Sequence, residues 1–206
     1  MPSNFAEFNK QVWKFNEEWT AIRLIGALRS AYEFWIPITT KNGTQTVVPK
    51  ICLDWDSVRH VQRTETCPYC QAGLQGRTVY FSNAIIRPLQ QADPAHPERS
   101  VHVIKFPPRF YQLLCGMNTL NRKRMKSGEY KYYDAADPMF GFDIEVKANP
   151  DTPYSYYDAQ LDMRVRLTPE ELAYPLVSLD IQRESLSEAR HAWHKLRGLY
   201  VRKPGV

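Results

Sequence analysis

Long apolar runs are missing from this sequence, and so are the features of a secretion signal. No stretch approaches the ~18 consecutive apolar residues that a membrane-spanning helix needs. Residues 1–20 mix charged and aromatic side chains, and they lack the basic start and apolar centre of a signal peptide. We therefore expect a cytoplasmic protein with no membrane partner, whose four cysteines bind metal or stay reduced rather than form disulfides.

The sequence patterns of common enzyme classes are missing as well. The chain has no Gly-rich phosphate loop, no His-Glu-x-x-His helix and no Ser-His-Asp order, and it shows no internal repeat. At 206 residues it is long enough to bury a core, and 13% of its residues are aromatic. These observations favour a non-enzymatic globular protein with one domain and added elements.

Acidic residues are scarce in two parts of the chain, which makes those parts basic. Residues 101–131 contain seven Lys or Arg and one acid, and residues 190–206 contain five Lys or Arg and no acid. Between them, residues 134–158 carry six acids against one lysine. Basic surfaces attract polyanions, so nucleic acid is the first partner to consider, although a charged face can also be merely solvated.

Short β-branched and aromatic runs between turn residues predict strands. These runs are residues 32–40, 44–53, 78–87, 100–106, 141–148 and 154–167. Apolar residues at helical spacing predict an amphipathic helix over residues 4–19, capped by Asn4, and another over residues 185–200. A shorter helix is predicted to begin at residues 107–108, which are both Pro, and to end at Gly116.

From these elements we predict a mainly β (α+β) fold. Residues 30–168 would form a small closed barrel of about five or six strands, since short strands with one helix among them are more typical of a barrel than of a sandwich. Residues 1–29 would form the N-terminal helix and a linker, and residues 169–206 the C-terminal helix and a basic tail. A zinc-knuckle subdomain is expected within the barrel, at about residues 50–76.

The stretch CPYC, residues 67–70, allows either redox chemistry or metal binding. A redox dithiol of this kind follows a buried strand and begins a long helix, whose N-terminus activates the first thiol. Here the preceding residues 57–66 are largely polar, and Gly73 and Gly76 end any helix soon after Cys70. We therefore favour a metal knuckle over a dithiol oxidoreductase.

A structural zinc site needs four ligands in a tetrahedron. Cys67 and Cys70 would supply two ligands, and Cys52, at the end of a predicted strand fifteen positions before Cys67, would supply the third across a hairpin. We predict His60 as the fourth ligand, because it lies between these cysteines in the sequence. Two other residues are alternatives for the fourth position: Cys115 and His102. A closed four-ligand set leaves no position for water, so the predicted Zn2+ is structural and not catalytic.

The order of these motifs resembles that of the zinc-containing single-stranded DNA-binding proteins of tailed bacteriophages. The most specific parts are CPYC followed closely by VYFSNAIIR (79–87), and DPMFGFDIEV (137–146), within a resemblance over roughly residues 30–165. The resemblance implies an oligonucleotide-binding (OB) barrel with an inserted zinc subdomain, present in the host cytoplasm during infection. Two features depart from that family: no His precedes Cys52 in AYEFWIPITT, and the chain ends in VRKPGV instead of an acidic tail.

Binding of single strands needs cations for the phosphates and flat side chains on which bases stack. On and beside the predicted strands the candidates are Tyr32, Trp35, Tyr80, Arg87, Lys105 and Arg109. A predicted flexible loop, residues 121–133, adds Arg122, Lys123, Arg124, Lys126, Lys131 and Tyr132. Strict alternation would place Tyr80 and Phe81 on opposite faces of a strand, so at most one of them stacks on a base.

We therefore expect a non-enzymatic phage protein that holds single-stranded DNA during replication, recombination or transcription, with little sequence preference. The alternative is a zinc-bearing accessory factor of a phage RNA polymerase or replication complex that acts mainly through protein contacts. The aromatic stripe of the predicted N-terminal helix favours homo-oligomers or cooperative assembly on DNA, because uncovered stripes mark interfaces. Packing of the stripe onto the chain's own barrel is the other outcome.

Overall fold

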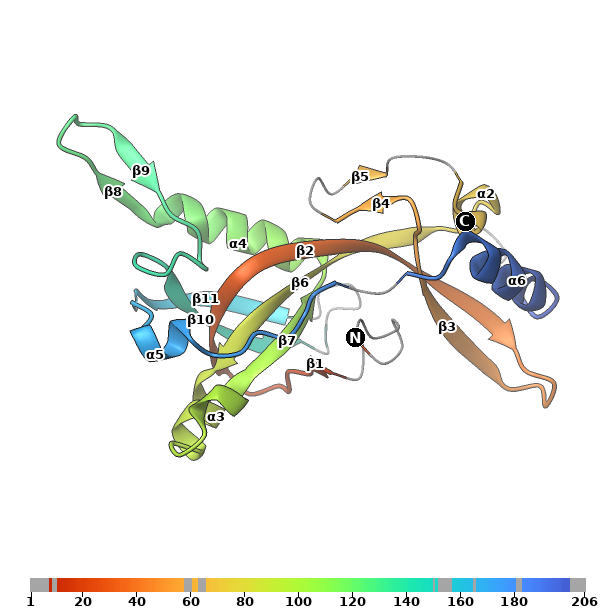
Figure 1. Cartoon of the computed structure of the whole chain (residues 1–206), viewed down its shortest axis with the longest axis horizontal. Helices are drawn as coiled ribbons and strands as arrows, with labels where there is room; N and C mark the ends of the chain where they lie inside the picture. Colours follow the sequence, from red (N-terminus) through yellow and green to blue (C-terminus); the bar gives the residue numbers. More distant parts are fainter. Residues whose placement is uncertain are drawn as a thin grey trace. The chain divides into compact units, whose positions relative to one another are not determined.

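The computed structural model describes most of the chain (Figure 1). The chain divides into two compact units. Unit 1 comprises Met1–Lys10, Ser30–Val79 and Asp180–Val206, and unit 2 comprises Gln11–Arg29 and Tyr80–Leu179. The described residues are 8, 11–57, 61–62, 66–149, 151, 157–164, 166–180 and 183–200, with the side chains of 61–62 and 157–164 left out. Within them, no helix is both long and apolar enough to cross a membrane.

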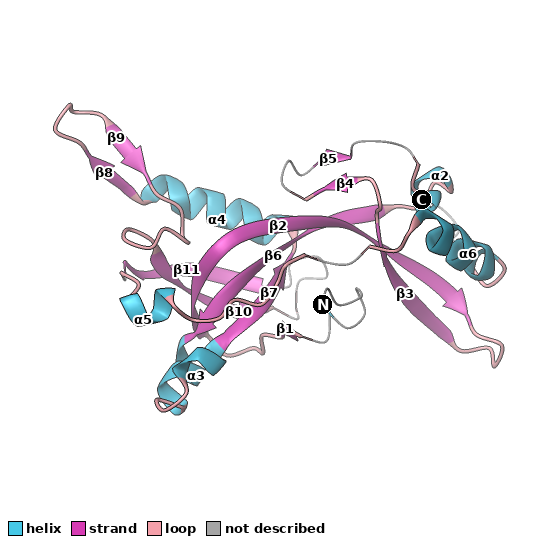
Figure 2. Cartoon of the chain, in the orientation of Figure 1, coloured by secondary structure: helices cyan, strands magenta, loops and turns pink. Residues whose placement is uncertain are grey.

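Unit 2 is built on a mainly antiparallel sheet (Figure 2). The strand order is β1 (Val12–Trp13), β7 (Val101–Phe106), β6 (Gly76–Ile86), β2 (Thr20–Thr39), β10 (Phe142–Ala148) and β11 (Tyr157–Arg164). β6 pairs antiparallel with β7, and β10 pairs antiparallel with β2 and β11, whereas β1 runs parallel to β7. Strands β2 and β6 also contribute residues to unit 1.

This sheet is open, so the closed barrel that we predicted is wrong. The strand order ends at β1 on one side and at β11 on the other, and no pairing joins these two strands in the described part of the chain. Closure needs a ladder between the first and last strands. β1 has only two residues and offers too short a ladder. The coarser prediction of a mainly β fold with few helices is confirmed.

The main apolar core of unit 2 lies between the sheet and α4 (Pro108–Leu120). Phe110, Leu114 and Met117 of α4 are buried in one cluster with side chains of β2, β6, β7 and β10. Proline at the first position starts α4 as predicted, but the helix continues past Gly116 because Met117 extends its buried stripe. Short helices connect or follow the strands: α3 (Arg87–Ala92), the 3-10 turn η1 (Pro97–Ser100) and α5 (Pro169–Leu172).

The N-terminal helix that we predicted is wrong over residues 11–19. Val12 and Trp13 form β1 beside β7, where the Trp13 ring lies 4.9 Å from the ring of His102. Strand β2 already begins at Thr20, so the predicted linker is also strand. Pairing with β7 outweighs the helical spacing, because tertiary contacts override local preference. The prediction of self-association depended on the aromatic stripe of that helix, so this argument for it no longer holds. Phe5, the first residue of the stripe, lies outside the described residues.

Unit 1 contains a β-hairpin that is covered on one face by two helices. Residues 33–39 of β2 pair antiparallel with β3 (Gln45–Ile51), and their inner side chains share a core with α2 (Pro68–Gln71) and α6 (Leu186–Arg197). A capping box of Ser185 and Glu188 starts α6, so the predicted C-terminal helix is confirmed. A separate small pair joins β4 (Trp55–Asp56) to β5 (Val61–Gln62).

Candidate metal centre and nucleic-acid interface

Three cysteines of unit 1 meet at one point. Cys52 follows the last residue of β3, Cys67 is the residue before α2, and Cys70 lies in α2. Their sulfur atoms all lie within 4.8 Å of one another, and those of Cys52 and Cys70 are 3.5 Å apart. Thiolates on one tetrahedral zinc ion are about 3.8 Å apart, because each Zn–S bond is about 2.3 Å long. The cluster therefore fits a metal ion with little adjustment.

The backbone around the knuckle holds these sulfurs in place. The carboxylate of Asp54 accepts hydrogen bonds from the Cys67 amide and from the Thr66 hydroxyl, each 2.7 Å long. Beyond α2, Gly73 adopts a left-handed conformation with φ of 69°, which turns the chain back. The helix is only four residues long. This agrees with the expectation that no long helix follows Cys70.

The thiols differ in pKa. The pKa of Cys67 is lowered to about 6, first by a hydrogen bond from the Cys52 thiol and further by nearby backbone groups. The same hydrogen bond, together with burial, raises the pKa of Cys52, and burial raises the pKa of Cys70 to about 11. A thiolate favoured at Cys67 gives a cation its first ligand, and coordination then releases the other two protons.

The structure places the three predicted cysteine ligands together, but it does not identify the fourth ligand. His60 lies outside the described residues, so its role stays a prediction. The alternatives belong to unit 2: Cys115 is exposed on α4, and the His102 ring packs at a tilt against the ring of Trp13. Neither belongs to the cysteine cluster, which is the group of possible metal ligands found in the described part of the chain.

The basic segment after α4 is a β-hairpin and not the flexible loop that we predicted. β8 (Arg122–Arg124) pairs antiparallel with β9 (Tyr130–Tyr132), and Gly128, with φ of 88°, closes the turn. In Figure 1 the hairpin projects from the end of α4. Every residue from 122 to 132 is exposed, including Lys126 in the turn. We call residues 122–132 the basic hairpin.

The basic hairpin has two different faces. In its register Arg122 lies opposite Tyr132, Arg124 opposite Tyr130, and Lys123 opposite Lys131. Residues opposite each other share a face, and successive residues alternate between faces. One face therefore carries two arginines and two tyrosines, which we call the Arg–Tyr face, and the other carries the two lysines. Arg122 lies over the Tyr130 ring, with 4.6 Å between its Cζ atom and the ring centroid.

The lysine face and the base of the basic hairpin contact other residues of unit 2. The Nζ atoms of Lys123 and Lys131 lie 5.1 Å and 5.3 Å from the ring centroids of Phe140 and Tyr133, respectively. These two rings pack on each other at 4.3 Å. The buried Asn121 side chain donates to the carbonyls of Tyr133 and Phe140. The Arg–Tyr face is thus left toward solvent on an anchored support.

Among the remaining predicted aromatic contacts, Trp35 alone is well exposed. This residue is 45% exposed on the outer face of β2, and the Arg77 guanidinium lies 5.4 Å from its ring centroid. Tyr32 is half-buried and stacks on Trp55. Tyr80 is buried between Tyr111 and Phe106, and Phe81 is fully buried, so neither strand aromatic offers a free face. Sequence reasoning missed Arg77, because 42 positions separate it from Trp35.

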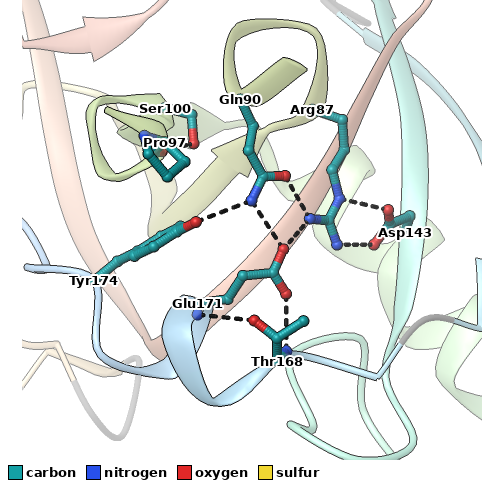
Figure 3. Close-up of polar contacts among 8 residues, drawn as sticks. All are labelled: Arg87, Gln90, Pro97, Ser100, Asp143, Thr168, Glu171 and Tyr174. Carbon is teal, nitrogen blue, oxygen red and sulfur yellow. Dashed lines mark hydrogen bonds and ion pairs between the residues drawn. The ribbon is translucent and has the colours of Figure 1, made fainter. Parts of the chain in front are cut away.

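The predicted cations of unit 2 fall into different environments. Arg109 is exposed in the first turn of α4, and Lys105 is half-buried with its Nζ 5.9 Å from the centre of the Phe81 ring. Arg87 is occupied by acids: it donates two hydrogen bonds to Asp143, 2.7 Å and 3.1 Å long, and it pairs with Glu171 (Figure 3). We therefore leave Arg87 out of the proposed nucleic-acid surface.

The Arg87 network holds α5 against the sheet (Figure 3). Glu171 accepts a hydrogen bond from Gln90 and completes a capping box with Thr168. Burial alone would raise the pKa of Glu171, but the hydrogen bonds from Gln90 and the Thr168 amide, together with Arg87, lower it. Arg87 and Gln90 belong to α3, while Glu171 belongs to α5, so the network joins two elements distant in the sequence.

We expect unit 2 to lose stability in acid through Glu171. Because folding lowers this pKa, the contribution is complete above pH ~4.5 and is lost as pH falls through the lower folded value. Glu171→Gln should cost about 2 kcal/mol at neutral pH, and its deficit relative to the parent should shrink below pH ~4.5. Urea unfolding from pH 7 to pH 3 measures this, with Glu17→Gln at an exposed position as the control. A deficit independent of pH would contradict the assignment.

The fold and the sites define a mainly β protein with a cluster of three cysteines that can bind a metal ion and an exposed basic hairpin. Comparisons with protein-family models, with curated proteins and with solved structures find no match to this chain. The functional argument therefore depends on the geometry of these two features.

Proposed function

We propose that this protein is a non-enzymatic single-stranded DNA-binding protein and that the basic hairpin is its main contact surface. The observation that carries the proposal is the Arg–Tyr face, which places two guanidinium groups and two phenol rings side by side in solvent. Guanidinium groups bind phosphates, and aromatic rings stack on unpaired bases whatever their identity. The phage proteins that the sequence resembles bind the same class of ligand.

The composition of the Arg–Tyr face favours single strands over duplex DNA. Tyr132 is 55% exposed, and Tyr130, whose ring has Arg122 over one face, is 48% exposed, so both residues offer ring surface to a base. Stacking on each base contributes about 1–3 kcal/mol, which a duplex cannot gain because its bases already stack on one another. Outside the hairpin, exposed Trp35 with Arg77 offers a second pairing of ring and cation, on unit 1.

We also propose that the cysteine cluster holds Zn2+ as a structural ion, with His60 as fourth ligand. The ion would connect the end of β3 to α2 and so stabilise unit 1, without a part in chemistry. An accessory factor that acts through protein contacts is the second candidate. The exposed apolar side chains of Trp35 and Val47 on the β2–β3 hairpin favour it.

The test compares two pairs of substitutions of equal charge on opposite faces of the basic hairpin. Arg122→Ala with Arg124→Ala should weaken binding to oligo(dT) about 10- to 30-fold near 0.1 M salt and reduce the salt slope by about 1.4. Lys123→Ala with Lys131→Ala removes the same charge from the anchored face and should change both quantities much less. Fluorescence anisotropy over a salt series measures both. Equal effects would assign binding to net charge alone.

A third variant separates stacking from charge. Tyr132→Ala should lower affinity about 5- to 150-fold with an unchanged salt slope, because a lost stack releases no counterions. Duplex DNA of the same length should bind more weakly than oligo(dT) to the parent protein. If the parent does not bind oligo(dT), or if the arginine pair binds as the parent does, the proposed surface is overturned.

A further inference from the structure

Helix α6 of unit 1 has a solvent-facing side that is strongly basic. Ala189 is fully buried, and Trp193 and Leu196 pack beside it against the core of unit 1. The exposed residues of the last two turns include three cations and two histidines: Arg190, His191, His194, Lys195 and Arg197. At 100° per residue these five side chains span an arc of about 160°, directly opposite the buried side. We call this arc the α6 basic face.

The acids closest in sequence to the α6 basic face are already engaged. Glu188 accepts a hydrogen bond from the Ser185 amide in the capping box, at the other end of the helix. Glu184 pairs with Lys50 and accepts a hydrogen bond from the Tyr69 hydroxyl. Among the ion pairs found in the described residues, none involves Arg190, Lys195 or Arg197. Within the part of the chain that the structure describes, the cations of this face are therefore not paired with acids.

We propose that the α6 basic face is a second phosphate-binding surface, through which unit 1 contacts the backbone of the same single-stranded DNA. This inference rests on the proposed function of the basic hairpin, which belongs to unit 2. Cations gathered on one helix face suit a phosphate backbone, which needs charge and no apolar contact. A protein partner would instead require an apolar centre. Of the large apolar residues of α6, Trp193 and Leu196 are turned to the core, while Leu186, the first residue of the helix, is 37% exposed.

Two contact surfaces on one chain make binding depend on DNA length. A short oligonucleotide occupies one surface, whereas a longer one reaches both, and the second contact is then intramolecular. The parent protein should therefore gain affinity and salt dependence as oligo(dT) is lengthened. A protein lacking the α6 basic face should lack this gain and still bind short oligonucleotides through the basic hairpin.

The experiment replaces three cations by glutamine, which preserves helix propensity: Arg190→Gln, Lys195→Gln and Arg197→Gln. With long oligo(dT) the salt slope should fall by about 2. Raising the salt from 50 to 200 mM should then weaken the binding of the parent by a factor roughly 15 to 20 times larger than that for the variant. With the shortest oligonucleotides that bind, the two proteins should agree. Lys14→Gln, Lys41→Gln and Arg166→Gln remove the same charge from exposed positions elsewhere and serve as the control.

The outcomes separate this inference from the proposed function. If the parent binds no single-stranded DNA, the proposed function fails, and this inference fails with it. If the parent binds and the basic hairpin variants weaken binding, but the α6 variant matches the control at every length, only the α6 inference is overturned. Circular dichroism and the melting temperature establish that α6 still folds. Should the α6 variant be unfolded, Lys195→Gln alone is compared with Lys41→Gln in the same length series.

Discussion

Cys67→Ser should abolish metal binding and unfold unit 1. Serine offers a weakly acidic hydroxyl in place of the thiolate that the Cys52 hydrogen bond favours at this position. In small structural zinc sites the metal contributes about 10 kcal/mol or more, which is comparable to the whole stability of a domain. Elemental analysis of the purified protein should show one zinc per parent chain and none in the variant, with a large fall in melting temperature.

Cys115→Ser is the matched control for the same experiment. This cysteine is exposed on α4 and belongs to unit 2, outside the cluster, so its replacement should leave metal content and melting temperature unchanged. A Cys67→Ser protein that keeps its zinc would overturn the ligand assignment. Parent protein that contains no metal, and whose thiols cycle to a disulfide, would favour the dithiol interpretation of CPYC instead.

Gly141→Ala should destabilise unit 2 by about 3 kcal/mol, although it adds only one methyl group. The new Cβ would lie 2.5 Å from the carbonyl oxygen of Asp137, and the carbonyl oxygen of Ala135 would be closer still. Both are backbone atoms that cannot move away cheaply. The Cβ would also meet the guanidinium of Arg23, 2.5 Å away, which is fully buried and donates to the Asp137 carbonyl.

Gly116→Ala provides the opposite control. It lies inside α4, where an added Cβ meets nothing within 4 Å, so alanine should stabilise the protein by about 0.5–1 kcal/mol through helix propensity. Urea unfolding of both variants measures the contrast. If Gly141→Ala is within 0.5 kcal/mol of the parent, roughly the scatter of surface substitutions, the tight turn before β10 is less rigid than described.

Local sequence signals determined most of the strands and the two capped helices. The runs at 44–53, 78–87 and 100–106 form β3, β6 and β7, because β-branched residues suit a half-buried pleated surface wherever the sheet forms. Ser185 and Thr168 begin α6 and α5 through capping boxes, which depend only on residues three positions apart. These signals are short-range, so the sequence alone contains them.

The cysteine cluster could be predicted in part from the sequence for the same reason. A Cys-x-x-Cys turn brings two thiols together whatever the rest of the chain does, and the third cysteine at the end of a predicted strand completed the group. The fourth ligand could not be determined from the sequence, because its position depends on how segments distant in the sequence meet.

Tertiary structure decided which side chains face solvent and how the sheet ends. Helical spacing over residues 11–19 gave way to pairing with β7, and the two-residue β1 left the sheet open. Tyr80 and Arg87 are residue types that suit nucleic-acid binding. In the fold, however, Tyr111 covers the Tyr80 ring and Asp143 forms an ion pair with Arg87, and both partners are distant in the sequence. Composition predicted a basic segment at residues 121–133 but assigned it to a flexible loop. The tertiary structure makes it a hairpin, whose register separates the Arg–Tyr face from the lysine face. Burial and register are set by contacts between residues distant in the sequence, and local patterns carry no information on them.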